Sequence, residues 1–148
     1  MNTIHIGKET TEHIAINVLR KSHPDSNDYW DGNWLKCSVE VKAGSWIGKF
    51  EADLRTDEFH VFAEKLNELY NNLSGEIIFE PMEPWVKFKL VGDGRGHFSI
   101  EGEASDELGT GNRLIFNFEL DQTYLPNILD QLKEVNKKYP VIGLNKKT

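Results

Sequence analysis

Apolar residues recur at every second position along much of this chain and at helical spacing in only two stretches, and this order limits the available folds. Helical spacing marks 57–73, where Phe59, Phe62 and Leu66 share one face, and it marks 123–139. Strands that follow one another without an intervening helix argue against a parallel doubly wound sheet. The segments predicted as strands, most of them by period-two alternation, are 13–20, 34–42, 46–54, 76–81, 84–91, 96–103 and 112–120.

The order of elements, β-β-β-α-β-β-β-β-α, predicts an α+β fold built on an antiparallel sheet of about six to seven strands. Apolar and polar residues alternate along the strands, as they do when one face of a sheet is buried and the other is in water. We expect the sheet to be curved, as a half-barrel or a sandwich, with the two amphipathic helices covering its apolar side. The short segment 43–45 predicts a hairpin between 34–42 and 46–54.

The length of 148 residues predicts one domain spanning 1–148, large enough to bury a core without disulfides or metal. The periodic segments place that core at about 13–139, and we expect 1–12 and 141–148 to be peripheral. The one cysteine, Cys37, excludes a disulfide within the chain and a zinc site built on several cysteines. Because Cys37 lies in the apolar phase of its strand, we predict that it is a small core residue.

The charge and the apolar runs limit the kinds of partner that we expect. The formal net charge is −7, which argues against binding to nucleic acid or to an anionic membrane and leaves room for a basic partner. No apolar run approaches the roughly 18 residues of a membrane span, and the charged start of the sequence does not resemble a signal peptide. We therefore expect a cytoplasmic protein with no nucleic-acid or membrane partner, and a monomer is the favoured state.

The residues that usually carry catalysis or bind metal are scattered. No two of the five histidines have a metal-ligand spacing, and His97 shares a strand face with Ser99 and Glu101 instead of meeting them from separate elements. The glycine-rich segment 92–96 precedes a strand, whereas a phosphate-binding loop precedes a helix. We predict no catalytic residue, no metal and no cofactor. The alternative is an enzyme or small-ligand-binding domain with a pocket between sheet and helices, using His97 or His60.

Carboxylates gather in two parts of the sequence. The loop 22–33 contains three aspartates next to large aromatic residues, and 76–121 contains ten carboxylates against four basic residues. Aromatic anchors ringed by charge are typical of protein interfaces, and charge asymmetry steers an oppositely charged partner. The alternative is a solvated acidic surface with no partner. The residues predicted to contact a partner are Asp25, Asp28, Tyr29, Trp30, Asp31, Glu101, Glu103, Asp106 and Glu107.

Two short motifs carry a resemblance to a known family. The run from Asp28 to Leu35, which reads D-Y-W-D-G-N-W-L and leads into an alternating strand, resembles a signature of the WapI family of bacterial immunity proteins. The sequence Tyr124-Leu125-Pro126 resembles the start of the last helix in that family. The resemblance implies a small cytoplasmic protein that binds and neutralises a toxin domain delivered by a sibling bacterium, often a nuclease. It implies no particular functional residues.

Overall fold

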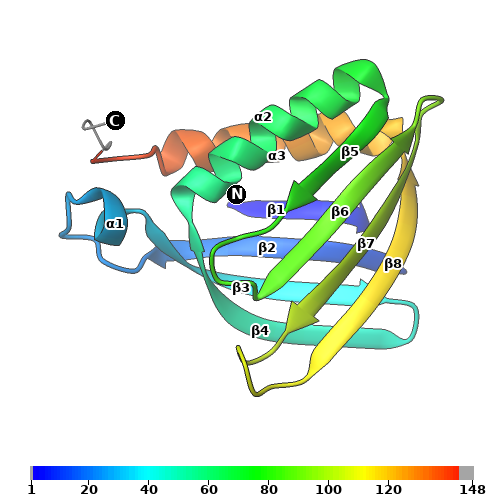
Figure 1. Cartoon of the computed structure of the whole chain (residues 1–148). Helices are drawn as coiled ribbons and strands as arrows, with labels where there is room; N and C mark the ends of the chain where they lie inside the picture. Colours follow the sequence, from blue (N-terminus) through cyan, green and yellow to red (C-terminus); the bar gives the residue numbers. More distant parts are fainter. Residues whose placement is uncertain (1, 144–148) are drawn as a thin grey trace.

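Two four-stranded antiparallel sheets and three α-helices make up the computed structural model, which describes residues 2–143 (Figure 1). The first sheet has the order β1-β2-β3-β4 and the second has the order β5-β6-β7-β8. The elements of the first half are β1 (Thr3–Lys8), β2 (Glu12–Lys21), α1 (Tyr29–Gly32), β3 (Trp34–Ala43), β4 (Trp46–Arg55) and α2 (Thr56–Asn72). Those of the second half are β5 (Ser74–Phe79), β6 (Val86–Asp93), β7 (His97–Ser105), β8 (Arg113–Asp121), the 3₁₀ turn η1 (Gln122–Tyr124) and α3 (Leu125–Lys138).

The α+β class, the antiparallel pairing and the two long amphipathic helices are confirmed, but the single sheet of six to seven strands is wrong. Residues 2–143 form eight strands in two sheets. The additional strand is β1, in a segment expected to be peripheral, where Ile4 and Ile6 are fully buried opposite Ile16 and Ile14. Two alternating isoleucines next to a glycine are too short a pattern to stand out from a loop.

The C-terminal segment was also expected to be peripheral, and its described part is not. After α3 the backbone N–H and C=O of Ile142 both form hydrogen bonds with the side chain of Asn33, which ties the end of the described chain to the start of β3. The remainder of the predicted segment, 144–148, lies outside the described residues. Both ends of the described chain therefore contribute to the packed structure.

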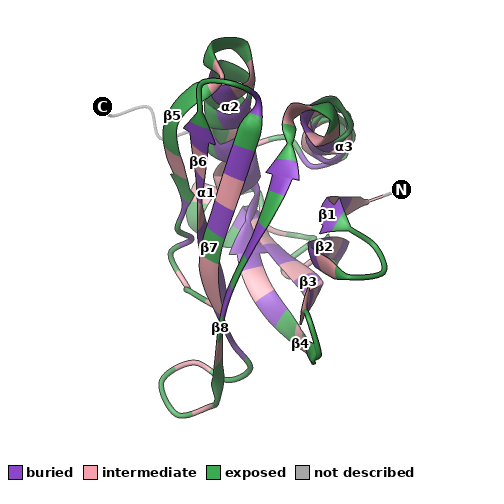
Figure 2. Ribbon diagram, turned by 90° about the vertical axis from the view of Figure 1, so that its right-hand side faces the viewer, coloured by how far each residue is buried: buried purple, intermediate pink, exposed green. Residues whose placement is uncertain are grey.

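The chain is made of two units of the same type, each with four strands followed by a long helix. The helix of each unit packs against the first strand of the other unit, so that α2 contacts β5 and α3 contacts β1. The two helices also pack against each other, side by side along one end of the two sheets (Figures 1 and 2). This exchange joins the two units through a shared layer of helices.

The core lies between the inward faces of the two sheets and beneath the helices. Buried positions alternate with half-buried ones along β3 and β6 and with exposed ones along β8, as the sequence pattern predicts (Figure 2). Phenylalanine rings fill the space next to α2: Phe62 lies 5.3 Å from Phe79 and 5.6 Å from Phe88, measured between ring centroids. The interior beneath α2 is thus occupied by side chains of both halves.

Cys37 is a buried core residue, as predicted, and this makes its thiol a probe of unfolding. It is fully buried in β3, and burial raises the pKa of the thiol to about 12. Because the thiolate is the reactive form, iodoacetamide should modify folded protein only as fast as the protein opens. The measurement is the alkylation rate at pH 8 in water and in increasing urea, by mass spectrometry. Complete modification within seconds in water would contradict the buried position.

Candidate functional site

The connection between β2 and β3 contains α1, a single helical turn whose start is fixed by its own sequence. Asp28 is the N-cap, and its Oδ2 accepts hydrogen bonds from the backbone N–H groups of Trp30 at 3.0 Å and Asp31 at 2.9 Å. The turn closes where the N–H of Gly32 donates to the carbonyl oxygen of Asp28 at 2.7 Å. Asp28 was predicted to contact a partner, but its carboxylate is engaged in holding this turn together.

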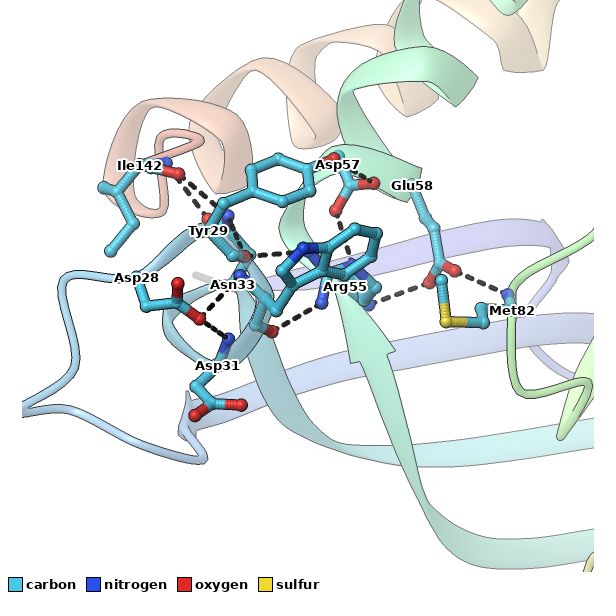
Figure 3. A network of polar contacts seen from close by, with 10 residues as sticks. Asp28, Tyr29, Asp31, Asn33, Arg55, Asp57, Glu58, Met82 and Ile142 are labelled. Carbon is cyan, nitrogen blue, oxygen red and sulfur yellow. Dashed lines mark hydrogen bonds and ion pairs between the residues drawn. The ribbon is translucent and has the colours of Figure 1, made fainter. Parts of the chain in front are cut away.

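A buried arginine lies under α1 (Figure 3). The side chain of Arg55, the last residue of β4, is 1% exposed and donates from Nη1 to the carbonyl oxygen of Trp30 at 2.7 Å and from Nη2 to that of Tyr29 at 2.9 Å. Its Nε donates to Oδ1 of Asp57 at 3.0 Å. The rings of Tyr29, Trp30 and Trp34 lie 5.1–5.3 Å from the guanidinium carbon, within cation–π range. Arg55 therefore fixes both the backbone and the rings of α1.

The other end of α1 is fixed by Asn33, which is fully buried. Its Nδ2 donates to the carbonyl oxygens of Tyr29 at 2.8 Å and Ile142 at 3.0 Å, and its Oδ1 accepts from the N–H of Ile142 at 3.0 Å. A buried amide with all these groups paired holds one conformation, because any unpaired polar group would be costly. The D-Y-W-D-G-N-W motif thus encodes a rigid turn.

Glu58 connects this region to the second half of the chain (Figure 3). Its Oε1 accepts from the N–H of Arg55 at 2.8 Å, which caps the start of α2, and its Oε2 accepts from the N–H of Met82 at 2.6 Å. Burial raises the pKa of this carboxyl group above its ordinary value. Met82 lies in the connection between β5 and β6, and its side chain is exposed. Hydrogen bonds through Arg55 and Glu58 therefore connect the backbone of Trp30 to the backbone of Met82.

The surface of α1 presents an aromatic ring among carboxylates. The side chain of Trp30 is 55% exposed, and Asp25 and Asp31 are exposed and pair with no other residue between 2 and 143. Tyr29 is half-buried, and its hydroxyl lies 3.4 Å from Oδ2 of Asp57. Of the five residues predicted in this loop, Trp30, Asp25 and Asp31 have side chains available to a partner, whereas Asp28 and Tyr29 mainly support the turn.

The second predicted group lies on a different part of the molecule. Glu101 and Glu103 are on the outer face of β7, and Asp106 and Glu107 are in the loop between β7 and β8, which lies away from α1 (Figure 1). Glu103 lies 3.4 Å from Nη1 of Arg113 and 3.9 Å from Nζ of Lys87. Oδ1 of Asp106 accepts from the N–H of Asn112 at 2.8 Å and so shapes its own loop. Within residues 2–143, the side chains of Glu101 and Glu107 form no ion pair or hydrogen bond.

The alternative of a catalytic or ligand-binding pocket finds no support in the placement of the histidines. His97 is exposed at the start of β7, and a ring nitrogen of His60 lies 3.4 Å from the carbonyl oxygen of Tyr139. Residues 2–143 contain no group of three or more histidine, cysteine or acidic side chains placed to hold a metal ion. Among the described helices, none is long and apolar enough to cross a membrane.

Comparisons with solved structures find matches of low sequence identity. One is a crystal structure of MRP1/MRP2 from a Trypanosoma species, at 7% identity over 93% of this chain and 84% of that chain, with a TM-score of 0.49. Another is the plant transcriptional regulator PBF-2, at 12% identity over 95% of this chain and 82% of that chain, with a TM-score of 0.47. These values carry no argument about function. No curated protein matches the sequence.

The sequence itself matches a family model over most of its length. The match covers residues 5–140 and therefore includes α1, Arg55, both sheets and α3. The motif from Asp28 to Leu35 that carried the resemblance lies within it, as does Tyr124-Leu125-Pro126. The chain belongs to the Immunity protein WapI-like family.

Proposed function

We propose that this protein neutralises a toxin domain by binding to it, without catalysis, and that the toxin domain is a basic nuclease. Membership of an immunity protein family indicates the role, and the net charge of −7 suits a basic partner. A nuclease domain presents lysine and arginine to the phosphates of its substrate, and carboxylates on an inhibitor match that surface. An inhibitor of a nuclease that acts in the cytoplasm has to be present there, so we also propose a cytoplasmic location for this protein. We further propose that the protein is a monomer before it binds the toxin domain.

One observation carries the proposed binding site: Trp30 is exposed and yet fixed. Interfaces derive much of their affinity from a few aromatic residues, and a residue that is already ordered loses less entropy on binding. Trp30 meets both conditions because its carbonyl and its ring are held by Arg55. The unpaired carboxylates of Asp25 and Asp31 lie in the same loop. We place the centre of the interface at Trp30, with these two aspartates at its edge.

The experiment that tests the function is a pull-down from a lysate of the source cells with the protein as bait, eluted by a salt gradient. We expect one basic polypeptide in equal molar amount to the bait, which mass spectrometry identifies. That polypeptide should stop growth when expressed alone, and expression of this protein with it should restore growth. If the retained polypeptide is harmless in cells, or if growth is not restored, the proposed function is wrong.

The electrostatic part of the proposal predicts the effect of charge reversal. Replacing both Asp25 and Asp31 by lysine should slow association with the retained polypeptide by about tenfold at low salt, because like charges then oppose the encounter. Both side chains are exposed and unpaired among the described residues, so the folded state should be unaffected. The matched control is the same double reversal at Glu51 and Asp130. Equal association rates for the two double variants, measured by stopped flow, would contradict this role of the loop.

A further inference from the structure

Exposed aliphatic side chains continue from the region of α1 onto the second sheet. Val61 lies on the exposed side of α2, Ile78 is on β5, and Ile115 on β8 is 76% exposed. Ile115 stands in the polar phase of its strand, where its neighbours Arg113 and Asn117 are exposed as well. The exposed parts of these side chains bury no apolar area within the chain, so they form a surface that packing within the described residues does not cover.

Two neighbouring grooves contain these residues. The first, of about 370 Å³, lies between the start of α2 and β5 and is lined by Asp57, Val61 and Ile78 among others. The second, of about 460 Å³, crosses the outer face of the second sheet from Ile78 to Ile115. Ile78 and Glu80 line both grooves, so the two grooves are adjacent. We call the two grooves together the trough; the lining includes Asp57, which contacts Arg55 and Tyr29.

The trough is acidic overall. Its lining includes five carboxylates and three lysines: Asp57, Glu58, Glu80, Glu101, Glu103, Lys65, Lys87 and Lys89. Two of the lysines are directed to acidic side chains, since Nζ of Lys87 lies 3.9 Å from Glu103 and Nζ of Lys89 lies 4.0 Å from Glu76. Glu80 and Glu101 pair with no other residue of the described chain. The trough therefore combines exposed aliphatic groups with unpaired negative charge.

The outer face of the first sheet gives the contrast. Three lysines on β3 and β4 are balanced there by three carboxylates, and close pairs such as Lys36 with Asp53 at 2.7 Å and Lys49 with Glu40 at 3.6 Å neutralise them. The outer face of β3 and β4 is thus balanced in charge, whereas the lining of the trough has an excess of carboxylates.

We propose that the trough is part of the interface centred on Trp30, so that one basic protein surface covers Trp30, Ile78 and Ile115 together. This inference rests on the proposed function and extends it to a second part of the same partner. A specific interface buries about 800 Å² on each partner, from about 20 residues, which the four residues of α1 cannot provide. The stems of lysine and arginine pack on aliphatic groups while their charged ends reach carboxylates, which matches Ile78 and Ile115 beside Glu80 and Glu101.

The test measures the affinity of four variants for the basic polypeptide retained in the pull-down. Ile115→Arg and Glu101→Lys change the trough, and Ile47→Arg and Glu51→Lys make the same changes on β4, where Ile47 is 54% exposed. We expect each trough variant to raise the Kd by about tenfold or more, and each control to change it by less than about twofold. All four positions are exposed, so each variant should have the same unfolding temperature as the unaltered protein. An unchanged unfolding temperature shows that a loss of affinity does not come from a loss of folding.

A selective loss of affinity in the two trough variants supports the inference. It is overturned if both trough variants bind as their controls do. That result would leave the proposed function standing, because neutralisation of the polypeptide in cells is measured separately with the unaltered protein. Failure of the unaltered protein to restore growth would instead remove the proposed function, and the inference with it.

Discussion

Replacing Arg55 by methionine should lower the free energy of unfolding by about 3 kcal/mol, because a buried polar network loses its central donor. The carbonyl oxygen of Trp30 and the carboxylate of Asp57 would each lose the partner that Arg55 supplies. The carbonyl oxygen of Tyr29 would still accept from Asn33, which is why the loss is not larger. In a chain of this length the change corresponds to a fall of about 10 °C in the unfolding temperature.

Urea unfolding and near-ultraviolet circular dichroism check this prediction. The aromatic signal should decrease even in the folded variant, since three rings lose the cation they pack on. Arg20→Met is the matched control, because Arg20 is exposed on β2 and forms no ion pair with a described residue. Arg55→Lys should be nearly as destabilised as Arg55→Met, since one ammonium group cannot reproduce the planar fork that reaches both carbonyls. An Arg55→Met protein as stable as Arg20→Met would refute the structural role of the buried arginine.

Replacing Trp30 by alanine should weaken binding to the basic polypeptide by about 2–3 kcal/mol, or about 30- to 150-fold in Kd. The exposed part of the indole provides the contact area, and its attachment to Arg55 means that little ordering is required on binding. The loss should appear mainly as faster dissociation, since the charges that steer association remain. Stability should fall by only about 1 kcal/mol, the contribution of one partly exposed cation–π contact.

Trp46 provides the control for this measurement. It is 70% exposed, more than Trp30, and it lies at the start of β4 next to the hairpin turn, at the other end of that strand from Arg55. Trp46→Ala should bind the polypeptide with unchanged affinity, measured by isothermal titration calorimetry. If Trp46→Ala loses more affinity than Trp30→Ala, the interface is at the hairpin and not at α1.

The elements with long and regular patterns were predictable from the sequence. Apolar residues recur every three or four positions in 57–73, and this segment forms α2 at 56–72. The strands at 34–43 and 46–55 match their predicted ranges closely. Division into two sheets was not predictable, because each strand pattern records which face is buried and not which strand lies beside it. The repeat of four strands and a helix was not apparent, since the two units share an arrangement and not a recognisable residue pattern.

The aromatic and acidic composition of the loop 22–33 was visible in the sequence, and its role in binding stays a prediction. Composition alone does not separate an aspartate that caps a turn from one that is free, as Asp28 and Asp31 differ. Arg55 gave no signal, because an arginine at the end of a strand is ordinarily in water. Ile115 did give one: it interrupts the alternation of apolar and polar residues in β8, and its side chain is exposed.

The packing of each helix on the first strand of the other unit also affects the order in which the protein can fold. The backbone N–H of His5 in β1 donates to Oε1 of Gln131 in α3 at 2.8 Å, and the side chain of Asn33 accepts from the N–H of Ile142. These contacts of β1 and Asn33 can therefore form only after α3 and Ile142 are in place. Contacts that join such distant parts of a chain form slowly, because closing the long loop between them lowers the entropy first. On the ribosome, β1 cannot reach α3 until residues 125–138 have emerged. The Asn33 contacts of α1 are completed only after Ile142 has emerged, so a chain truncated before α3 lacks both that helix and the support of the turn that contains Trp30.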